Sequence, residues 1–274
     1  MNNNKKLTIR KFLALGREQK YSTGNRLKKN LFSLIGILPI NPRIRSGRTL
    51  SEIYGLNLPS DASVLDAGFG HGLTMFRLTQ DYPNWHIWGY ELEEQFVKNA
   101  QEIKQGGQFN RIDLEQINLE EMQDTSKYDL VYSCDVLEHV PDDMQVLENF
   151  ENALKPGGIL ILHLPLRYEE CKRIAPWFKN YTTSDHVRDE YLPQEITEKL
   201  ARTGFEAIAL QYGYGLFKGE LSFELNNFIN TNRYLLILSQ VLTLPFALIL
   251  GYLDIRYPPK SGNSLVIKAR KKKK

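Results

Sequence analysis

Short apolar segments alternate with longer amphipathic segments along the chain from residue 62 onward. The short segments predict strands at residues 62–66, 86–91, 112–117, 128–133, 159–164, 205–212 and 264–269. The amphipathic segments predict helices at 73–80, 93–105 and 142–154, and one more that Pro193 begins and Gly204 ends. Strands and helices that alternate at this spacing predict a parallel sheet with helices on both faces.

Residues 234–253, between the last two predicted strands, are twenty residues without a charge, a length that could span a bilayer. A single crossing is excluded if the strands on either side share one sheet, because the chain must return to the side that it left. Pro245 is expected to break a helix near the middle. Two interpretations stay open: a shallow interfacial or re-entrant membrane contact, and two short helices buried over the domain or a dimer interface.

Charge divides the chain into unlike parts, although the net charge is only +3. Residues 1–50 carry twelve Lys or Arg and the single acid Glu18, a net charge of +11, and residues 255–274 carry eight bases and no acid. The body between them has a net charge of −16. Basic ends suit a polyanionic surface, either membrane or nucleic acid; the alternative is that the final lysines are only a solvated tail.

Other features of composition and of the first residues bear on compartment. Two cysteines, Cys134 and Cys171, are too few for a disulfide framework and suit a reducing cytosol. Residues 1–30 are polar and basic, so no secretory signal peptide is expected. The apolar run 31–40 is too short to span a bilayer, and we expect it to pack on the domain or to lie in an interface.

The segment Val64-Leu-Asp-Ala-Gly-Phe-Gly-His-Gly72 follows a predicted strand and opens a predicted helix. Glycines in this position let the backbone approach a ligand at a helix N-terminus. Glu91, at the end of the next strand, is placed to accept hydrogen bonds from two ribose hydroxyls. The combination indicates a nucleoside ligand. The spacing G-x-G-x-G departs from the dinucleotide pattern G-x-G-x-x-G, and Asp66 beside it favours a cationic ligand over a phosphate.

These residues, with the segment 128–140 and Leu154-Lys-Pro-Gly-Gly-Ile-Leu160, resemble the class I S-adenosylmethionine-dependent methyltransferases. The resemblance covers about residues 60–212 and the final strand. It implies a doubly wound, seven-stranded, Rossmann-like α/β sheet whose last strand is antiparallel, with S-adenosylmethionine as cofactor. It divides the chain into a basic helical extension, 1–50, and a methyltransferase domain, 51–274, with an apolar helical insertion at 220–256 before the last strand.

The resemblance assigns cofactor binding to residues at the ends of the first four strands: Asp66, Gly68, Gly70, Gly72, Glu91, Asn118, Leu119, Cys134 and Asp135. In the family the glycine loop holds the methionine part and the acid after the second strand binds the ribose. Asn118 stands where the family commonly has an acid that faces the adenine amino group, and its carbonyl oxygen can still accept a bond. For Asn118 and Cys134 the alternative is an ordinary residue at a strand end.

Three histidines, His139, His163 and His186, are candidates for the base that deprotonates an acceptor, because a histidine titrates near neutrality. His139 follows the fourth strand, at the sheet edge where such ligands bind. His186, in Asp185-His-Val-Arg188, resembles a His-x-Arg segment that many small-molecule members of the family place over the substrate; the alternative is a solvated loop histidine. His163 lies in an apolar strand and is expected to be a core residue. No Cys/His cluster has zinc-ligand spacing, so no metal is expected.

The expected function is methyl transfer from S-adenosylmethionine to a small, lipophilic, membrane-associated acceptor by O- or C-methylation. The protein would be cytoplasmic and peripheral at the inner face of the membrane, which it would contact through 234–253 and its basic ends. One alternative is an RNA or protein methyltransferase that uses the basic ends, although no aromatic residues interleave with the final lysines and nucleic acid is not the expected partner. The other is a non-catalytic S-adenosylmethionine-binding adaptor.

Overall fold

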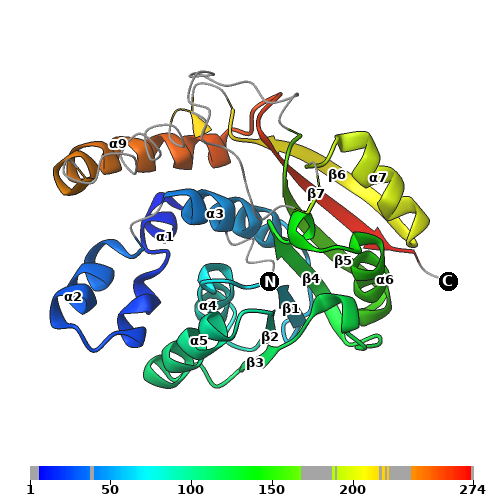
Figure 1. The fold of residues 1–274 in the computed structure, drawn as a ribbon, viewed down its shortest axis with the longest axis horizontal. Coiled ribbons are helices and arrows are strands. Elements are labelled where there is room, and N and C mark those ends of the chain that lie inside the picture. The colour runs from blue at the N-terminus through cyan, green and yellow to red at the C-terminus, as the bar shows by residue number, and fades with distance from the viewer. Residues whose placement is uncertain are drawn as a thin grey trace.

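The computed structural model describes residues 6–37, 40–167, 187–188, 190–215, 218–219, 221 and 236–272, with the backbone alone for 236–243. A seven-stranded sheet forms its centre, in the order β3-β2-β1-β4-β5-β7-β6 (Figure 1). The strands are β1 (Ser63–Ala67), β2 (His86–Glu91), β3 (Ile112–Gln116), β4 (Tyr128–Cys134), β5 (Leu154–Pro165), β6 (Phe205–Gly213) and β7 (Ser264–Lys271). Neighbouring strands are parallel except β7, which is antiparallel to β5 and β6. The predicted doubly wound fold with an antiparallel last strand is confirmed.

The helices cover both faces of the sheet. They are α1 (Ile9–Leu13), α2 (Arg26–Ile35), α3 (Ile40–Tyr54), α4 (Leu73–Asp81), α5 (Glu94–Gly107), α6 (Asp143–Ala153), α7 (Pro193–Arg202) and α9 (Leu236–Arg256). Short 3-10 helices are η1 (Arg17–Ser22), η2 (Leu119–Glu121) and η3 (Leu137–His139). Helix α3 continues across residue 50, where the extension was expected to end; that division of the chain stays a prediction.

Each face of the sheet has its own apolar core, because successive side chains of a strand point to opposite faces. Tyr132 of β4 and Ile161 of β5 lie in the core that α3, α4 and α5 cover. Val131 and Leu162, their neighbours in sequence, lie in the core under α6 and α7. Residues at the carboxyl ends of β4 and β5 therefore meet α3 on one side of the sheet, which decides what surrounds His163.

Helix α9 is continuous from Leu236 to Arg256 and contains Pro245, so the predicted break at this proline is wrong. A proline removes one N–H donor, but the turns on either side keep their bonds. The second half is held by packing: Leu248 and Ile255 are buried in the core with Ile44 of α3. The interpretation as two short helices therefore fails. Among the described residues, no helix combines the length and the apolar character that a bilayer crossing needs.

The sequence predicts a strand at 159–164 and a helix up to 154. In the structure β5 already begins at Leu154, directly after α6, and Leu154 pairs with Tyr128 before an irregularity in the ladder. Gly157 takes a left-handed φ of 78° within this stretch, which a residue with a side chain adopts only under strain. The Pro-Gly pair therefore marks a kink inside the strand.

Candidate functional site

The glycine loop connects β1 to α4 at the carboxyl edge of the sheet. Gly68, Gly70 and Gly72 have φ of 78°, 48° and 67°, all in the left-handed region that favours glycine. A Cβ at Gly68 would lie 2.3 Å from Cγ2 of Val136, so this loop closely approaches the chain that follows β4. A Cβ at Gly70 would meet no heavy atom within 4 Å. The loop is thus packed on one side and open at its middle.

Glu91 ends β2 and holds the glycine loop from the side. Its Oε2 accepts a hydrogen bond from the Gly70 amide at 2.8 Å, and its Oε1 accepts bonds from the amides of Leu92 and Glu93 at 2.9 and 3.1 Å. Each carboxylate oxygen has two lone pairs, so Oε2 keeps one for a ligand hydroxyl. Glu91 is half-buried, and its carboxylate is a strong hydrogen-bond acceptor directly beside the open part of the loop.

Asp66 lies below the loop, on β1, and its side chain is buried. The hydroxyl of Tyr132 on β4 donates to its Oδ2 at 2.8 Å. Burial raises the pKa of Asp66 to about 8, the nearby Glu91 adds to the rise, and the tyrosine bond opposes it. Asp66 is therefore mostly neutral at pH 7, and a cation placed near it would favour its ionised form.

Asn118 and Leu119 lie after β3, where η2 begins. The side-chain oxygen of Asn118 caps η2 by accepting from the Glu120 amide at 3.1 Å, and Asn118 lines a surface pocket beside β3 and η2. The Leu119 side chain is buried in the core under α6, and its carbonyl accepts from Asn149 at 2.8 Å. A role for Leu119 in cofactor binding would therefore involve its backbone, and both assignments stay predictions.

Cys134 and Asp135 follow β4 next to the glycine loop. Asp135 takes a left-handed φ of 52°, and the pKa of the Cys134 thiol is raised by burial and by the charge of Asp135. His139 is exposed at the end of η3. The structure therefore brings Cys134 and Asp135 to the predicted edge, and it leaves His139 further out on the surface.

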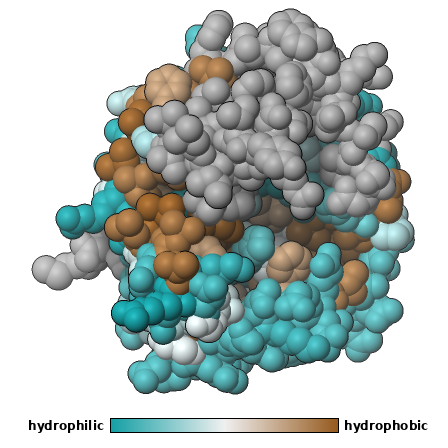
Figure 2. Space-filling view, turned by 60° about the vertical axis from the view of Figure 1, so that its left-hand side comes forward, coloured by the Kyte–Doolittle hydropathy of each residue, from teal (hydrophilic) through white to brown (hydrophobic). Residues whose placement is uncertain are grey.

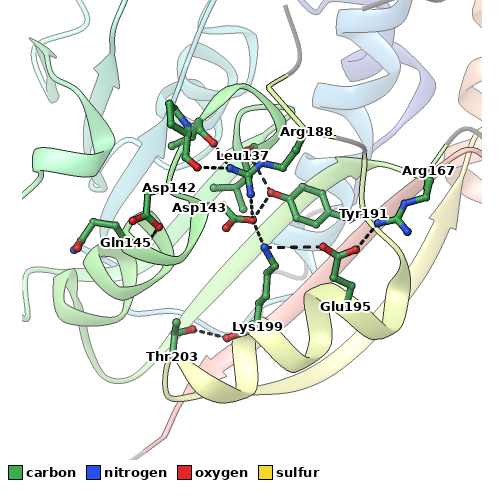
Figure 3. Close-up of polar contacts among 12 residues, drawn as sticks. Leu137, Asp142, Asp143, Gln145, Arg167, Arg188, Tyr191, Glu195, Lys199 and Thr203 are labelled. Carbon is green, nitrogen blue, oxygen red and sulfur yellow. Dashed lines mark hydrogen bonds and ion pairs between the residues drawn. The ribbon is translucent and has the colours of Figure 1, made fainter.

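His186 lies outside the described residues, but the two residues after it are held firmly. The Val187 amide donates to the Glu138 carbonyl at 3.1 Å. Arg188 forms an ion pair with Asp143 at 2.7 Å, and the Tyr191 hydroxyl donates to the same carboxylate at 2.7 Å (Figure 3). Arg188 of the expected His-x-Arg segment thus anchors the chain to α6, while the role of His186 stays a prediction.

Comparison with known proteins places this site in a family. Residues 65–160 match the family model described as a methyltransferase domain. The matched range contains the glycine loop, Glu91 and the end of β4. Residues 65–160 thus form a methyltransferase domain, and the match supports the class I S-adenosylmethionine-dependent superfamily.

Among curated proteins, this methyltransferase chain is 31% identical to trans-aconitate 2-methyltransferase of Variovorax paradoxus over 50% of its own length and 54% of the relative. It is 30% identical to tRNA U34 carboxymethyltransferase of Alteromonas mediterranea, over 53% and 45% of the two chains. It is 27% identical to ubiquinone biosynthesis O-methyltransferase of Rickettsia canadensis, over 64% and 76%. The chain thus spans about half the length of the first two relatives.

A solved structure shares the fold. Phosphoethanolamine N-methyltransferase 2 of Haemonchus contortus, in complex with S-adenosylmethionine, superposes with a TM-score of 0.56 and 18% identity over 79% of this chain and 50% of that chain. At this identity the likeness supports the methyltransferase fold and says nothing of the acceptor.

S-Adenosylmethionine is the cofactor that family membership implies, and the residues present fit it. Gly70 leaves open space in the loop, Glu91 has a lone pair to spare for a ribose hydroxyl, and Asp66 is a buried acid that a sulfonium or ammonium group would ionise. The cofactor, when bound, supplies an electrophilic methyl group on sulfur. The loop, Glu91 and Asp66 would hold it.

The first prediction concerns Glu91. Replacing it with Ala removes a charged acceptor and releases the Gly70 amide, so affinity for S-adenosylmethionine should fall by about 1.5–3 kcal/mol, or about 10- to 150-fold. Calorimetry on the folded variant measures this. Glu93→Ala is the matched control, because Glu93 is exposed and its side chain makes no capping bond. Unchanged affinity in Glu91→Ala would remove Glu91 from the site.

The second prediction concerns pH. A cationic ligand that ionises Asp66 must release its proton, so affinity for S-adenosylmethionine should rise as the pH increases toward the pKa of about 8. Below this pKa, the affinity for S-adenosylmethionine should rise by a factor that approaches ten for each pH unit. Calorimetry in buffers of different ionisation enthalpy should detect the proton that is released on binding. Asp66→Asn mimics the neutral acid and retains only the proton linkage of the ligand's own amine. Equal slopes in both proteins would contradict a contact between Asp66 and the cation.

Proposed function

We propose that the protein transfers the methyl group of S-adenosylmethionine to a small, lipophilic acceptor at a membrane surface. The observation that supports methyl transfer is the contact between the glycine loop and Glu91, whose Oε2 accepts a hydrogen bond from the Gly70 amide at 2.8 Å. An open loop at a helix N-terminus, beside a carboxylate with acceptor capacity left, suits a nucleoside donor. Because ligands of doubly wound sheets bind where the strand order reverses, an acceptor beside this donor would lie near the ends of β4 and β5, the next strands in the order.

The lipophilic part of the proposal is supported by α2. This helix has no buried residue, and Leu27, Leu31 and Leu34 are 81%, 39% and 71% exposed. Their spacing of four and three residues puts them on one face of the helix. Figure 2 shows apolar side chains grouped on the side of the molecule that is at the left in Figure 1, where α1, α2 and the start of α9 lie. A leucine stripe that no described residue covers suits an apolar environment.

The charges beside this stripe favour an anionic lipid surface as that environment. Arg26, Lys28 and Lys29 lie on the same helix, and α2 contains no acid. A basic helix with an apolar face inserts at the interface, where lysines meet headgroups and leucines meet acyl chains. Phe246 and Ile249 of α9 are 55% and 49% exposed and would add to the same contact. The contact expected for 234–253 is thus proposed to be centred on α2, with α9 beside it.

The relatives are compatible with this proposal and with one other. The Rickettsia canadensis relative is named for ubiquinone biosynthesis, whereas the Alteromonas mediterranea relative is named for a tRNA nucleotide. The basic residues of α2 could meet the phosphates of RNA as well as those of lipids. The exposed leucines are the feature that favours lipid, because phosphate contacts need no apolar stripe.

Release of S-adenosylhomocysteine is the measurement that tests the proposal. The purified protein and labelled S-adenosylmethionine are incubated with a membrane lipid extract, with bulk tRNA, or with neither. The proposal expects release and a labelled, chloroform-soluble product with the lipid extract alone. Label in the tRNA would establish the RNA alternative. Tight cofactor binding without release from any mixture would favour the non-catalytic adaptor.

A further inference from the structure

A histidine and a carboxylate meet at the ends of β5 and β4. His163 is 1% exposed, as expected for a core position, but its Nδ1 lies 2.7 Å from Oδ1 of Asp135. The other carboxylate oxygen, Oδ2, is 2.6 Å from Nε of Arg45 on α3. Side chains from β5 and from the distant helix α3 therefore converge on the buried carboxylate that follows β4.

The protonation of this pair follows from its surroundings. Burial alone would raise the pKa of Asp135, but the charge of Arg45 and the His163 ring hold it well below its usual range. An ionised carboxylate only accepts hydrogen bonds, so the ring N–H of His163 must be at Nδ1. In the neutral ring, Nε2 is then the nitrogen with the lone pair. The pair has the form of a histidine base oriented by a carboxylate.

The lone-pair nitrogen has no hydrogen-bond partner within the described part of the chain. Nε2 of His163 is fully buried and unpaired there. Burying a polar atom without a hydrogen-bond partner is unfavourable, so such an atom calls for a partner that the described chain does not supply. A bound acceptor with a hydroxyl group would be one.

The position of the pair relative to the glycine loop suits this role. His163 pairs with Cys134 across the β4–β5 ladder, and Asp135 is followed directly by Val136, the residue against which Gly68 packs. Ligands of doubly wound sheets bind at the carboxyl ends of the strands, where the order of strands reverses. Asp135 follows β4, the neighbour of β1, and His163 lies on β5, one strand further from the loop. An acceptor bound at this edge would lie between the donor and the pair.

The same side chains could instead bind a metal ion. Ligand atoms of Cys134, Asp135 and His163 lie within 4.8 Å of one another. However, the thiol pKa is raised, so it would not offer the thiolate that metals prefer, and the cationic Arg45 already neutralises Asp135. These features favour a proton-transfer pair over a cation site.

We propose that Nε2 of His163 accepts the proton of a hydroxyl acceptor during methyl transfer, with Asp135 and Arg45 as positioning residues. The inference rests on the proposed function and narrows its acceptor to an alcohol, phenol or enol. As the acceptor oxygen forms its bond to the methyl carbon, the carbon–sulfur bond breaks, its electron pair stays on sulfur, and the O–H proton moves to Nε2. The resulting imidazolium is stabilised by Asp135.

Several other titratable groups lie near the His163–Asp135 pair and would contribute to any pH dependence of the activity. They come from three elements packed around Asp135, namely Cys134 on β4, Glu138 and His139 on η3, and Tyr214 after β6. A pH profile alone would mix their titrations with that of His163. A comparison of acceptors that do and do not need a base separates the roles.

The test uses two probes with the same long alkyl chain: a simple phenol, with a pKa of about 10, and a nitrophenol that is already ionised in a mildly alkaline assay. General-base catalysis contributes about 10²- to 10⁴-fold, so His163→Gln should lower turnover of the simple phenol at least 100-fold and that of the nitrophenol less than fivefold. His86→Gln is the matched control, since His86 pairs with Asp113 at 2.7 Å at the opposite edge of the sheet and is partly exposed. It should change neither rate.

A second readout does not depend on turnover. Nitrogen NMR of the full-length protein should show His163 protonated at Nδ1 and unprotonated at Nε2, and Asp135→Asn should alter this tautomer balance. A proton found on Nε2 in the wild type, or equal losses on both phenols in His163→Gln, would overturn the base role. Wild-type protein that binds S-adenosylmethionine by calorimetry but methylates neither phenol would overturn the hydroxyl assignment and leave the proposed function standing. Absence of cofactor binding would instead contradict the proposed function.

Discussion

Replacing Asp254 with Ala is expected to lower the free energy of unfolding by about 3–5 kcal/mol, the usual cost of breaking a buried ion pair from one side. Asp254 is fully buried in the last turns of α9, and its carboxylate meets Arg48 of α3, which is 2% exposed. The same carboxylate accepts hydrogen bonds from the amides of Tyr214 and Gly215 at 2.9 and 3.0 Å. The variant would leave a buried guanidinium without its counter-ion and two amides without their acceptor.

Urea unfolding followed by circular dichroism measures this loss. Asp254→Asn should cost less than Asp254→Ala, because the amide oxygen can still accept one of the backbone bonds. Glu94→Ala is the matched control: its ion pair with Lys98 is exposed, and its removal should change stability by no more than about 0.5 kcal/mol. A cost below about 1 kcal/mol for Asp254→Ala would mean that α9 is not held to α3 by this pair.

The elements that sequence reasoning predicted well are those that local signals specify. Alternating apolar segments and helices gave the strands of the sheet, and glycines after a strand located the loop that binds Glu91. The left-handed φ angles at Gly68, Gly70 and Gly72 are what those glycines are needed for. Glu91 was found because its place, the end of the second strand, depends only on where that strand ends.

Contacts between distant segments carried no such signal. Arg48 and Asp254 are 206 residues apart, and nothing in the neighbourhood of either residue in sequence marks it as buried. Helix α9 passes through Pro245 because packing on α3 stabilises its second half, whereas the expected break came from the proline alone. Tertiary contacts overrode a local preference there.

The candidate site shows the same division. His163 was interpreted as a core residue because its neighbours in sequence are apolar, and it is indeed buried. Its partner Asp135 follows a different strand, and Arg45 lies on a helix that precedes the alternating strands and helices. The contacts among these residues form only when β4 and β5 pair in register and pack against α3. A histidine at the end of a buried strand and an acid after the adjacent parallel strand is the pattern that could have indicated it.

The membrane proposal leads to the other large effect. Replacing Leu27 and Leu34 together with Ser should weaken binding to anionic vesicles of phosphatidylglycerol and phosphatidylcholine at least 100-fold. Burial of a leucine contributes about 1.5–3 kcal/mol, so two of them contribute about 3–6 kcal/mol before ordering costs. Both side chains are more than two thirds exposed in the structure, at 81% and 71%, so the substitutions should leave the fold and S-adenosylmethionine affinity unchanged.

Vesicle sedimentation across salt concentrations separates the apolar contribution from the charges. Lys28→Ala with Lys29→Ala should weaken binding by about 1 kcal/mol per charge at low salt and have little effect at high salt, where the wild type should be only partly released. The leucine variant should be weaker at every salt concentration, because burial of apolar surface is not screened. If the wild type ignores the vesicles, or if the leucine variant binds as the wild type does, α2 does not contact lipid, and the case for a lipophilic acceptor loses its structural basis.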